Sequence, residues 1–551
     1  MTRHIPTDIE RERFDLIVIG AGINGTGIAR DAAMRGLHVL VVDKGDIASG
    51  TTSESTRLIH GGLRYLQHRE FGLVRESLRE RELLLRNAPH LVRPMPTLFP
   101  IYTGAKRGPM VVRAGMALYD LLSYDRSLDR HHMMTRDQAL MKAPGLEPAV
   151  LRAAALFFDA QAPFAERLAV ENVISARDHG ATILTYSRAD RIMTEGAVVR
   201  GVSLTDILTG DILTARSKIV VNVAGPWVDL VLTGAPAAGD QPRLIGGTRG
   251  SHLVVAPFPG APEVTLYFEA KADGRPMMVV PWNGFYLIGT TDIRDEGDPG
   301  EARAGDKEIA YLLDEANQLL PKAGLTVDDI LYTFSGVRPL PFTPDGTTAA
   351  ITRRHIIKNH APKLRGLYSI IGGKLTTYRS LAEETVDQIC DDLGVEATSP
   401  TAATPLPGAG DCSTIGRDLP APMRQRLTSI YGSRARELLD LARESPDLLE
   451  PFCPDTGAIG AEIVFAAQQE LATTLEDMLL RRTMAGLGPR MAIGADMAAA
   501  EVARCHLGWD QARAEREVAA YRAALDRFRP RALDEITTEQ PSPDPAGQGY
   551  G

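Results

Sequence analysis

The sequence predicts an α/β protein of three parts, and three observations support this prediction. Near the N-terminus, an apolar strand, a glycine-rich turn, a helix and a second apolar strand follow one another within residues 14–43. Strand-and-turn patterns then fill residues 190–223 and 245–293 without a long helix. After a segment rich in Pro, Gly, Ser and Thr (398–422), the chain becomes helical and rich in Ala, Arg and Glu. We therefore expect an α/β unit, a β-sheet unit laid over it and a separate helical C-terminal domain.

Composition narrows the classes of function. The chain has 551 residues, of which 44% are hydrophobic and 24% charged, as in a soluble globular protein. Its formal net charge of −9 disfavours general nucleic-acid binding, which relies on a basic face. The 4 cysteines include no CxxC pair, so no metal site is expected. No signal peptide opens the chain and no apolar run approaches the ~18 residues of a membrane span, which predicts a cytoplasmic protein.

The turn after the first strand has the pattern GxGxxG, in residues 20–25 (GAGING). Gly20 permits the tight turn, Gly22 lets the backbone approach a pyrophosphate, and Gly25 lets the helix pack against the strand. The helix N-terminus offers unpaired N–H groups to phosphates. Asp43 ends the second strand, where a carboxylate can hold ribose hydroxyls. These features together predict a dinucleotide site.

The glycine pattern alone does not choose between NAD and FAD. An NAD enzyme normally continues with further βα repeats, whereas here residues 44–68 form a loop rich in small polar residues. Such a loop, with SGTTS at 49–53 and HGG at 60–62, can lie along an extended cofactor. The N-terminal position of the pattern and the interrupted chain after it therefore favour FAD.

Longer motifs resemble one family. Residues 55–85 (STRLIHGGLRYLQHREFGLVRESLRERELLL), 332–340 (YTFSGVRPL) and 372–384 (GGKLTTYRSLAEE) are similar to segments of the FAD-dependent glycerol-3-phosphate dehydrogenases. These are the aerobic, respiratory enzymes among the D-amino-acid-oxidase-like flavoproteins. The resemblance runs from about residue 14 to about residue 390, and four shorter segments also match. They are NVAGPWVD (222–229), GSHLVV (250–255), IGTTDI (288–293) and, more loosely, LRRTMAGLG (480–488).

One residue departs from this resemblance, and one feature separates the chain from the anaerobic relatives. Asp43 stands where many of these flavoproteins have Glu, and either acid can accept ribose hydroxyls, so FAD remains the expected cofactor. The cysteine-rich C-terminal domain of the anaerobic relatives has no counterpart in this sequence.

The resemblance implies a glutathione-reductase-type FAD-binding domain, an antiparallel β-sheet substrate domain and a helical C-terminal domain. The oxidoreductase region would span residues 14–400 and the helical domain 401–530. The tail 531–551 contains three prolines and almost no apolar residue, so it is predicted to be disordered. Within the oxidoreductase region, the FAD-binding segments would be about 14–90, 160–230 and 335–395, and the substrate-domain segments about 91–159 and 231–334.

A phosphorylated alcohol needs cations for its dianion and a proton acceptor for its hydroxyl. By resemblance, Arg64 and Tyr65 line the substrate pocket, and Arg338 contacts the phosphate or the developing alkoxide. Lys374 meets the phosphate or the reduced flavin. His252 resembles the family's active-site histidine and is the expected general base, since an imidazole near its usual pKa accepts a proton at neutral pH. Structural roles stay open: a helix cap or ion pair for Arg64, an ion pair for Arg338, and a core position for His252.

The remaining expected contacts to FAD are spread over several segments. They are backbone groups and small side chains of the glycine-rich turn, the polar loop and three later segments. They comprise Gly20, Gly22, Asn24, Gly25, Asp43, Thr52, Ser53, His60, Gly61, Ala189, Ala224, Gly225, Gly373, Leu375 and Thr376.

The implied reaction is the oxidation of sn-glycerol 3-phosphate to dihydroxyacetone phosphate, with hydride passing from C2 to the flavin N5 and electrons continuing to a membrane quinone. Three alternatives stay open: an oxidase that reduces oxygen to hydrogen peroxide, an amine or amino-acid oxidase on the same fold, and a non-catalytic flavin-binding scaffold. The sequence does not fix the oligomeric state, and a homodimer is compatible with it.

A quinone acceptor implies peripheral attachment to the inner face of the cell membrane. The best sequence candidate for a docking segment is Leu475–Arg490, where apolar residues accompany Arg481 and Arg482. Packing of this segment inside the helical domain is the favoured alternative, because a short helix routinely buries such a stripe.

Overall fold

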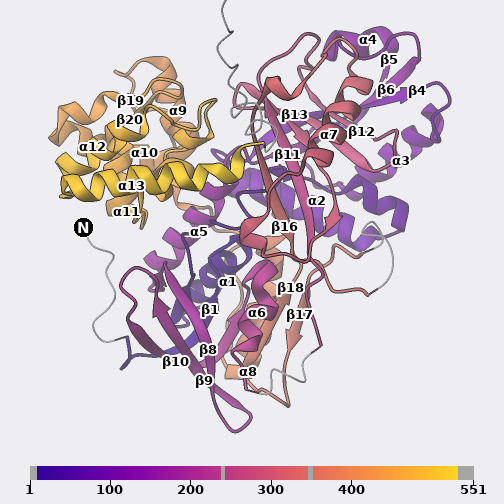
Figure 1. The fold of residues 1–551 in the computed structure, drawn as a ribbon. Helices are drawn as coiled ribbons and strands as arrows, with labels where there is room; N and C mark the ends of the chain where they lie inside the picture. The colour runs from indigo at the N-terminus through magenta and orange to yellow at the C-terminus, as the bar shows by residue number, and fades with distance from the viewer. Residues whose placement is uncertain (1–8, 237–241, 345–350, 531–551) are drawn as a thin grey trace, which may run out of the picture.

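The structure is a computed structural model, and it describes residues 9–236, 242–344 and 351–530. Figure 1 shows three parts: one sheet in the lower half, a second sheet at the upper right, and the C-terminal helices, orange to yellow, at the upper left. The predicted three-part α/β architecture is confirmed. The tail 531–551 lies outside the described residues.

The first sheet is parallel at its centre. Its central strands are, in order across the sheet, β18 (Leu367–Ile371), β10 (Ile212–Asn222), β1 (Arg13–Ile19), β2 (Val39–Val42) and β7 (Thr182–Leu184). Antiparallel strands extend it at β18 and at the first half of β10. They are β17 (Ile356–Asn359), β8 (Ser187–Glu195) and β9 (Val198–Asp206).

Different layers cover the two faces of this sheet. One face packs against three helices, α1 (Ile23–Met34), α5 (Ala165–Asp178) and α8 (Tyr378–Leu393). The other face packs against β8, β9 and the short helix α6 (Val228–Thr233). All four residues of β2 are apolar and buried, as expected for a parallel strand covered on both sides.

The second sheet has ten strands, and the pairs between them are antiparallel except for the parallel pair of β4 and β12. The predicted antiparallel substrate sheet is therefore confirmed with one parallel pair. It also includes β3 and the end of β16, which were expected to lie in FAD-binding segments. The strands are β3 (Leu58–Ile59), β4 (Arg93–Tyr102), β5 (His132–Thr135), β6 (Leu151–Gln161), β11 (Thr248–Val255), β12 (Thr265–Glu269), β13 (Pro276–Trp282), β14 (Phe285–Gly289), β15 (Ile293–Arg294) and β16 (Ile330–Arg338).

Four helices accompany the second sheet. Two of them share a small apolar cluster with β4 and β6, and the other two pack within a larger cluster around β11 to β14. The helices of the first pair are α2 (Phe71–Asn87) and α3 (Pro109–Leu122), and those of the second are α4 (Arg136–Lys142) and α7 (Asp306–Leu319).

The C-terminal domain is helical, with one two-stranded sheet formed by β19 (Pro451–Cys453) and β20 (Ala458–Ile459). The preceding segment, 398–422, is packed on the first sheet's helices rather than free: Arg30 Nη2 donates to Thr404 O at 2.8 Å, and Gly408 N donates to Glu171 Oε2 at 2.7 Å. The helices are α9 (Ala421–Tyr431), α10 (Ala435–Glu444), α11 (Gly460–Gln469), α12 (Asp496–Leu507) and α13 (Gln511–Ala524).

The segment Leu475–Arg490 lies largely in the interior of the protein. The hypothesis that it docks on a membrane is therefore wrong. Leu475 and Leu479 are fully buried. Arg481 Nε and Arg482 Nη2 lie 2.6 and 2.7 Å from the carboxylate of Asp46, which belongs to the loop after β2. The segment therefore packs inside the helical domain, which was the favoured alternative. Its two arginines join this domain to the first sheet through Asp46. In the described part of the chain, no helix combines the length and apolar character that crossing a membrane requires.

Candidate active site

A cavity of about 890 Å³ is lined by residues from both large sheets and by one residue of the C-terminal domain. It runs from the glycine-rich turn and Asp43 to His252, Arg338 and Lys374. All the predicted site residues line it except Gly25, Ser53 and Gly61. The fold therefore brings together segments that are far apart in the sequence.

The glycine-rich turn has the geometry that its spacing predicts. Gly20 has a φ of +117°, and a Cβ there would lie 2.7 Å from Val223 O. A Cβ on Gly25 would lie 1.9 Å from Gly20 O, so Gly25 serves the packing of α1 on β1, and it does not line the cavity. Thr52 Oγ1 accepts a hydrogen bond from Ile23 N at 3.0 Å, which ties the polar loop to the start of α1. The turn thus presents backbone to the cavity, as phosphate binding requires.

Asp43 is fixed at the end of β2 by two backbone groups. Its Oδ2 accepts from Ala21 N at 2.6 Å and its Oδ1 from Gly45 N at 2.8 Å. Burial raises the pKa of Asp43, while these two hydrogen bonds oppose the shift. Each carboxylate oxygen retains a lone pair for a further donor, so a ribose hydroxyl fits here.

The turn after β18 lies beside the start of α1. Gly373 has a φ of +97°, and a Cβ there would lie 2.3 Å from Asn24 Nδ2. Asn24 Nδ2 donates to Gly372 O at 3.4 Å, whereas its Oδ1 is buried and has no hydrogen-bond partner among the described residues. Thr376 Oγ1 accepts from His60 N at 3.2 Å. The unpaired Oδ1 of Asn24 and the close approach of the Gly373 backbone fit an extended dinucleotide such as FAD.

Three other predicted cofactor contacts line the cavity near the end of β10. Ala189 lies on β8, and Ala224 and Gly225 form the turn after β10, where Gly225 has a φ of +58°. Ser53 and Gly61 have local roles instead. Ser53 Oγ donates to Ala48 O at 2.5 Å, and a Cβ on Gly61 would lie 2.3 Å from the Tyr119 hydroxyl, so Gly61 is required by packing.

At the other end of the cavity, two guanidinium groups share one carboxylate. Arg338 Nη1 lies 3.2 Å from Asp292 Oδ1, and Arg353 Nη2 lies 3.1 Å from Asp292 Oδ2. Arg338 Nη2 also donates to Thr290 Oγ1 at 3.0 Å. Burial lowers the pKa of Arg338 to about 10, and Asp292 opposes that shift. Arg338 therefore forms the ion pair that was left open as an alternative. The group of Arg338, Arg353 and Asp292 still has a net positive charge, because two cations share one carboxylate.

Two further cations complete this end of the cavity. Lys374 Nζ donates to Ser77 Oγ at 2.8 Å and lies 4.9 Å from the centre of the Tyr65 ring. Burial lowers the pKa of Lys374 to about 8, against the attraction of Glu76 and Glu70. Arg64 also lines the cavity. It has no ion pair with any carboxylate in the described part of the chain, so the ion-pair alternative for it is not observed there.

His252 lies on β11 and is 2% exposed. Its ring stacks on Phe334 with centroids 4.7 Å apart, and its Nε2 lies 2.8 Å from Thr56 Oγ1. Burial, followed by the charges of Arg338 and Arg57, lowers the pKa of His252 to about 3. The expectation of an imidazole near its usual pKa is therefore wrong. His252 is neutral at neutral pH and can still accept a proton or a hydrogen bond.

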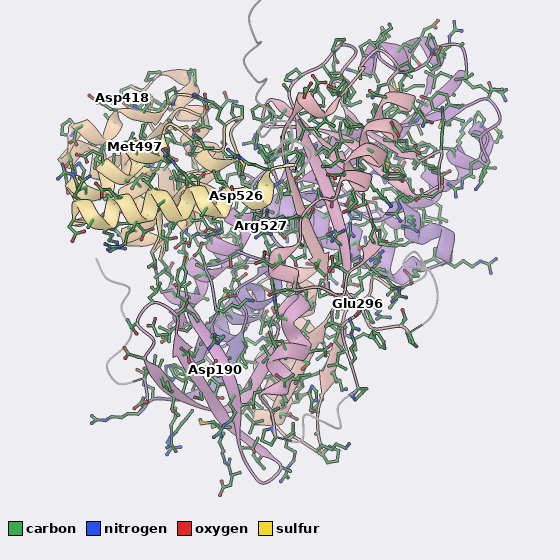
Figure 2. The ribbon with its side chains drawn as sticks, in the orientation of Figure 1. Asp190, Glu296, Asp418, Met497, Asp526 and Arg527 are labelled. Carbon is green, nitrogen blue, oxygen red and sulfur yellow. The ribbon has the colours of Figure 1, made fainter. Side chains whose placement is uncertain are left out.

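Several cavity residues had no place in the sequence prediction. Thr56 and Asp292 stood inside quoted motifs, so a signal existed for them, whereas Arg353 follows no recognisable motif. Glu54 also lines the cavity and pairs with Arg527, which comes from the end of the C-terminal domain. Figure 2 labels Arg527 where that domain meets the two sheets. Burial raises the pKa of Glu54 to about 7, although Arg527 opposes the shift.

Comparisons with known proteins agree with this geometry. Residues 15–379 match the family model of FAD dependent oxidoreductases, and residues 370–514 match the model described as the C-terminal domain of alpha-glycerophosphate oxidase. A glycerol-3-phosphate dehydrogenase of Synechocystis is 43% identical over 95% of this chain and 98% of its own length. An aerobic glycerol-3-phosphate dehydrogenase of Staphylococcus haemolyticus is 32% identical over 87% of this chain and 88% of its own.

A solved structure is similar along the same length. The glycerol-3-phosphate dehydrogenase of Bacillus halodurans, complexed with FAD, has a TM-score of 0.75 and 28% identity, and the match covers 95% of this chain and 96% of that one. The family model spans well over half of the chain, and the Synechocystis relative is matched almost end to end. The chain therefore belongs to the FAD-dependent glycerol-3-phosphate dehydrogenase family.

Proposed function

We propose that this enzyme oxidises sn-glycerol 3-phosphate to dihydroxyacetone phosphate and passes the electrons to a membrane quinone from the inner face of the cell membrane. One observation carries the proposal: the cavity that begins at the dinucleotide turn ends in a cation cluster beside a neutral histidine. The names of the relatives support the same substrate. An amino-acid substrate would need a cation for its carboxylate but not this cluster of cations.

FAD, when bound, supplies the acceptor for the two electrons that leave C2 of the substrate. The chain's contribution begins with holding that cofactor. Asp43 would accept ribose hydroxyls, Gly22 and the first N–H groups of α1 would face the pyrophosphate, and Gly373 to Thr376 would contact the far end. Ala189, Ala224 and Gly225 would line the remaining length.

The cations orient the substrate. A phosphate dianion placed among Arg64, Arg338, Arg353 and Lys374 would receive charge-assisted hydrogen bonds, and the two guanidinium forks allow bidentate contacts. Such contacts fix the position of C2 relative to the cofactor, which lowers the entropic cost of the reaction. Tyr65, against which Lys374 lies, closes one side of this site.

His252 would take the proton of the C2 hydroxyl. Its Nε2 points to Thr56, which also lines the cavity, so the Thr56 hydroxyl would orient the ring. A pKa of about 3 makes the free histidine a weak base. Because the positive charge of Arg338 contributes to that low pKa, a bound phosphate dianion would offset it and raise the pKa towards the working range.

The experiment for the proposed function is anaerobic addition of glycerol 3-phosphate to the purified holoenzyme. The expected result is bleaching of the flavin absorbance and its return when a soluble quinone analogue is added. A protein that stays yellow would contradict the dehydrogenase proposal and favour a non-catalytic flavoprotein. Rapid recovery of absorbance on admission of oxygen, with hydrogen peroxide formed, would favour the oxidase, an alternative kept open because the C-terminal match is to an alpha-glycerophosphate oxidase domain.

Replacement of Gly22 by valine is expected to yield protein with little or no bound flavin. A Cβ at Gly22 would lie 3.3 Å from Thr52 Oγ1, and the branched side chain would cover the backbone that faces the pyrophosphate. The measurement is the ratio of flavin absorbance to protein absorbance after purification. Gly72→Ala is the control, because a Cβ there meets nothing within 4 Å. A Gly22→Val protein with full flavin content would remove this turn from the FAD site.

The alkaline limb of kcat/KM is expected to report Lys374. Its pKa of about 8 means that the ammonium is lost as pH rises above that value, which removes one partner of the phosphate. In Lys374→Arg the cation persists at alkaline pH, so the limb should move to a higher pH. The measurement is kcat/KM against pH with a soluble dye acceptor. Lys322→Arg, an exposed lysine, is the control. If the alkaline limb of kcat/KM lies at the same pH in Lys374→Arg as in the unaltered enzyme, Lys374 does not bind the phosphate.

A further inference from the structure

Helix α3 (Pro109–Leu122) is apolar on almost every side. Its sequence, PMVVRAGMALYDLL, contains only two charged residues, Arg113 and Asp120. A helix of this kind is normally buried all round or placed in a lipid environment. Only Val112, Met116 and Tyr119 are buried, and these three share an apolar cluster with α2 and the second sheet.

The opposite side of α3 is exposed. Met110, Val111 and Leu121 are 76%, 59% and 69% exposed, and Tyr124, just beyond the helix, is 75% exposed. Of the eight large hydrophobic side chains of the described residues with an exposure of 59% or more, four therefore lie within these fifteen positions. Exposed hydrophobic residues scattered singly are ordinary, but a cluster of this size marks an interaction surface.

The segment that carries this surface has a small excess of positive charge. Residues 103–130 contain five Lys or Arg and three Asp, a local net charge of +2, whereas the whole chain carries −9. Lys106 and Arg113 are exposed and have no ion pair with any described residue, while Asp120 and Asp125 are already bonded to His131 and Arg75. Exposed apolar side chains with unpaired basic neighbours match the interfacial region of an anionic bilayer.

The position of α3 connects this surface to the cavity. Tyr119, on the buried side of the helix, accepts a hydrogen bond from Gly61 N at 3.0 Å and donates to Asp159 Oδ1 at 2.7 Å. Gly61 lies between His60 and Gly62, both of which line the cavity. In Figure 1, α3 is at the outer edge of the second sheet, on the side away from the C-terminal helices. A membrane on α3 would therefore lie directly behind one wall of the cavity.

We propose that the exposed face of α3 (Met110, Val111, Leu121 and Tyr124) docks on an anionic lipid surface with the helix axis in the plane of the bilayer. At a rise of about 1.5 Å per residue, fourteen residues extend only about 21 Å, which suits an interfacial helix and not a spanning one. The inference rests on the proposed membrane attachment and goes beyond it by assigning the attachment to this helix.

The experiment measures co-sedimentation of the FAD-loaded enzyme with vesicles of phosphatidylcholine containing about one third phosphatidylglycerol. We expect Met110→Glu/Leu121→Glu to bind at least about tenfold more weakly than the unaltered chain, because two charges would enter the apolar layer. The matched control is Ile212→Glu/Met497→Glu, two equally exposed apolar residues at 74% and 64% on other faces, which should bind as the unaltered chain does. Figure 2 labels Met497 on the C-terminal domain, far from α3.

Two further readouts make each outcome decisive. Dye-linked oxidation of glycerol 3-phosphate should be equal in all three proteins, because neither altered α3 residue lines the cavity. If the unaltered chain oxidises substrate but ignores the vesicles, both membrane attachment and the role of α3 are wrong while the reaction stands. If it binds vesicles and the α3 variant binds equally well, only the assignment to α3 is overturned. If the α3 variant instead loses mass in sedimentation without vesicles, the face joins two copies of the chain and the proposal fails.

Discussion

His252→Gln is expected to lower kcat by about 10²–10⁴-fold, the range for loss of a general base. Glutamine can keep a hydrogen bond to Thr56 and occupies similar space, but it cannot take a proton at neutral pH. The measurement is the rate of anaerobic flavin bleaching at saturating glycerol 3-phosphate, which isolates the step from the electron acceptor. Flavin content should be unchanged, because His252 is assigned to the substrate end of the cavity.

A second buried histidine provides the control for this variant. His360 is 5% exposed, its pKa is lowered to about 4 by burial, and it is hydrogen-bonded to Ser369 outside the cavity lining. His360→Gln therefore tests the loss of a buried neutral imidazole without touching the site. Comparable bleaching rates in His252→Gln and His360→Gln would show that His252 is a core residue, the alternative that its place in a strand left open.

The parts of the fold that depend on local spacing could be predicted from the sequence. The roles of Gly20 and Gly25 follow from the contacts of one turn with its own strand and helix, and the structure has the same contacts. The same holds for Asp43, which stands at the end of the second strand. Such features require only neighbouring residues, so a pattern in the sequence contains the necessary information.

The features that depend on distant partners could not be predicted in this way. The sequence shows that Leu475–Arg490 is apolar and basic, but not that Arg481 bonds Asp46, which lies 435 residues earlier. The low pKa of His252 likewise depends on Arg338 and Arg57, which come from other segments. Arg353 joins Arg338 only because the fold places both beside Asp292. In each case tertiary packing, and not local pattern, decides the chemistry.

The exposed face of α3 could not be predicted from the sequence for a different reason. Its apolar composition and the preceding Lys106 can be read from the sequence. Whether the apolar residues form part of a core or an interaction surface depends on which of them the fold buries. Leu475–Arg490 also combines apolar and basic residues, and its apolar side chains are largely buried, whereas those of α3 are in large part exposed. Apolar residues with basic neighbours are therefore ambiguous until the fold shows which side chains have partners.

Arg338→Lys is expected to lower kcat/KM for glycerol 3-phosphate by about 10–1000-fold, or roughly 1.4–4 kcal/mol of lost transition-state stabilisation. The guanidinium of Arg338 reaches Asp292 with one nitrogen and Thr290 with the other, which holds the group in one orientation. A lysine keeps the charge but has no second planar donor. Arg243→Lys, an exposed arginine paired with Glu296, is the control for the general effect of the change.

Unphosphorylated glycerol distinguishes the two roles left open for Arg338. Glycerol should be a very poor substrate of the unaltered enzyme, because it leaves the cation cluster without a partner. If Arg338 holds the phosphate, Arg338→Lys should impair oxidation of glycerol 3-phosphate and leave the slow oxidation of glycerol nearly unchanged. If Arg338 instead stabilises the developing alkoxide at C2, both substrates should lose rate by a similar factor. Unchanged kinetics on both substrates would assign Arg338 to its ion pair with Asp292 alone.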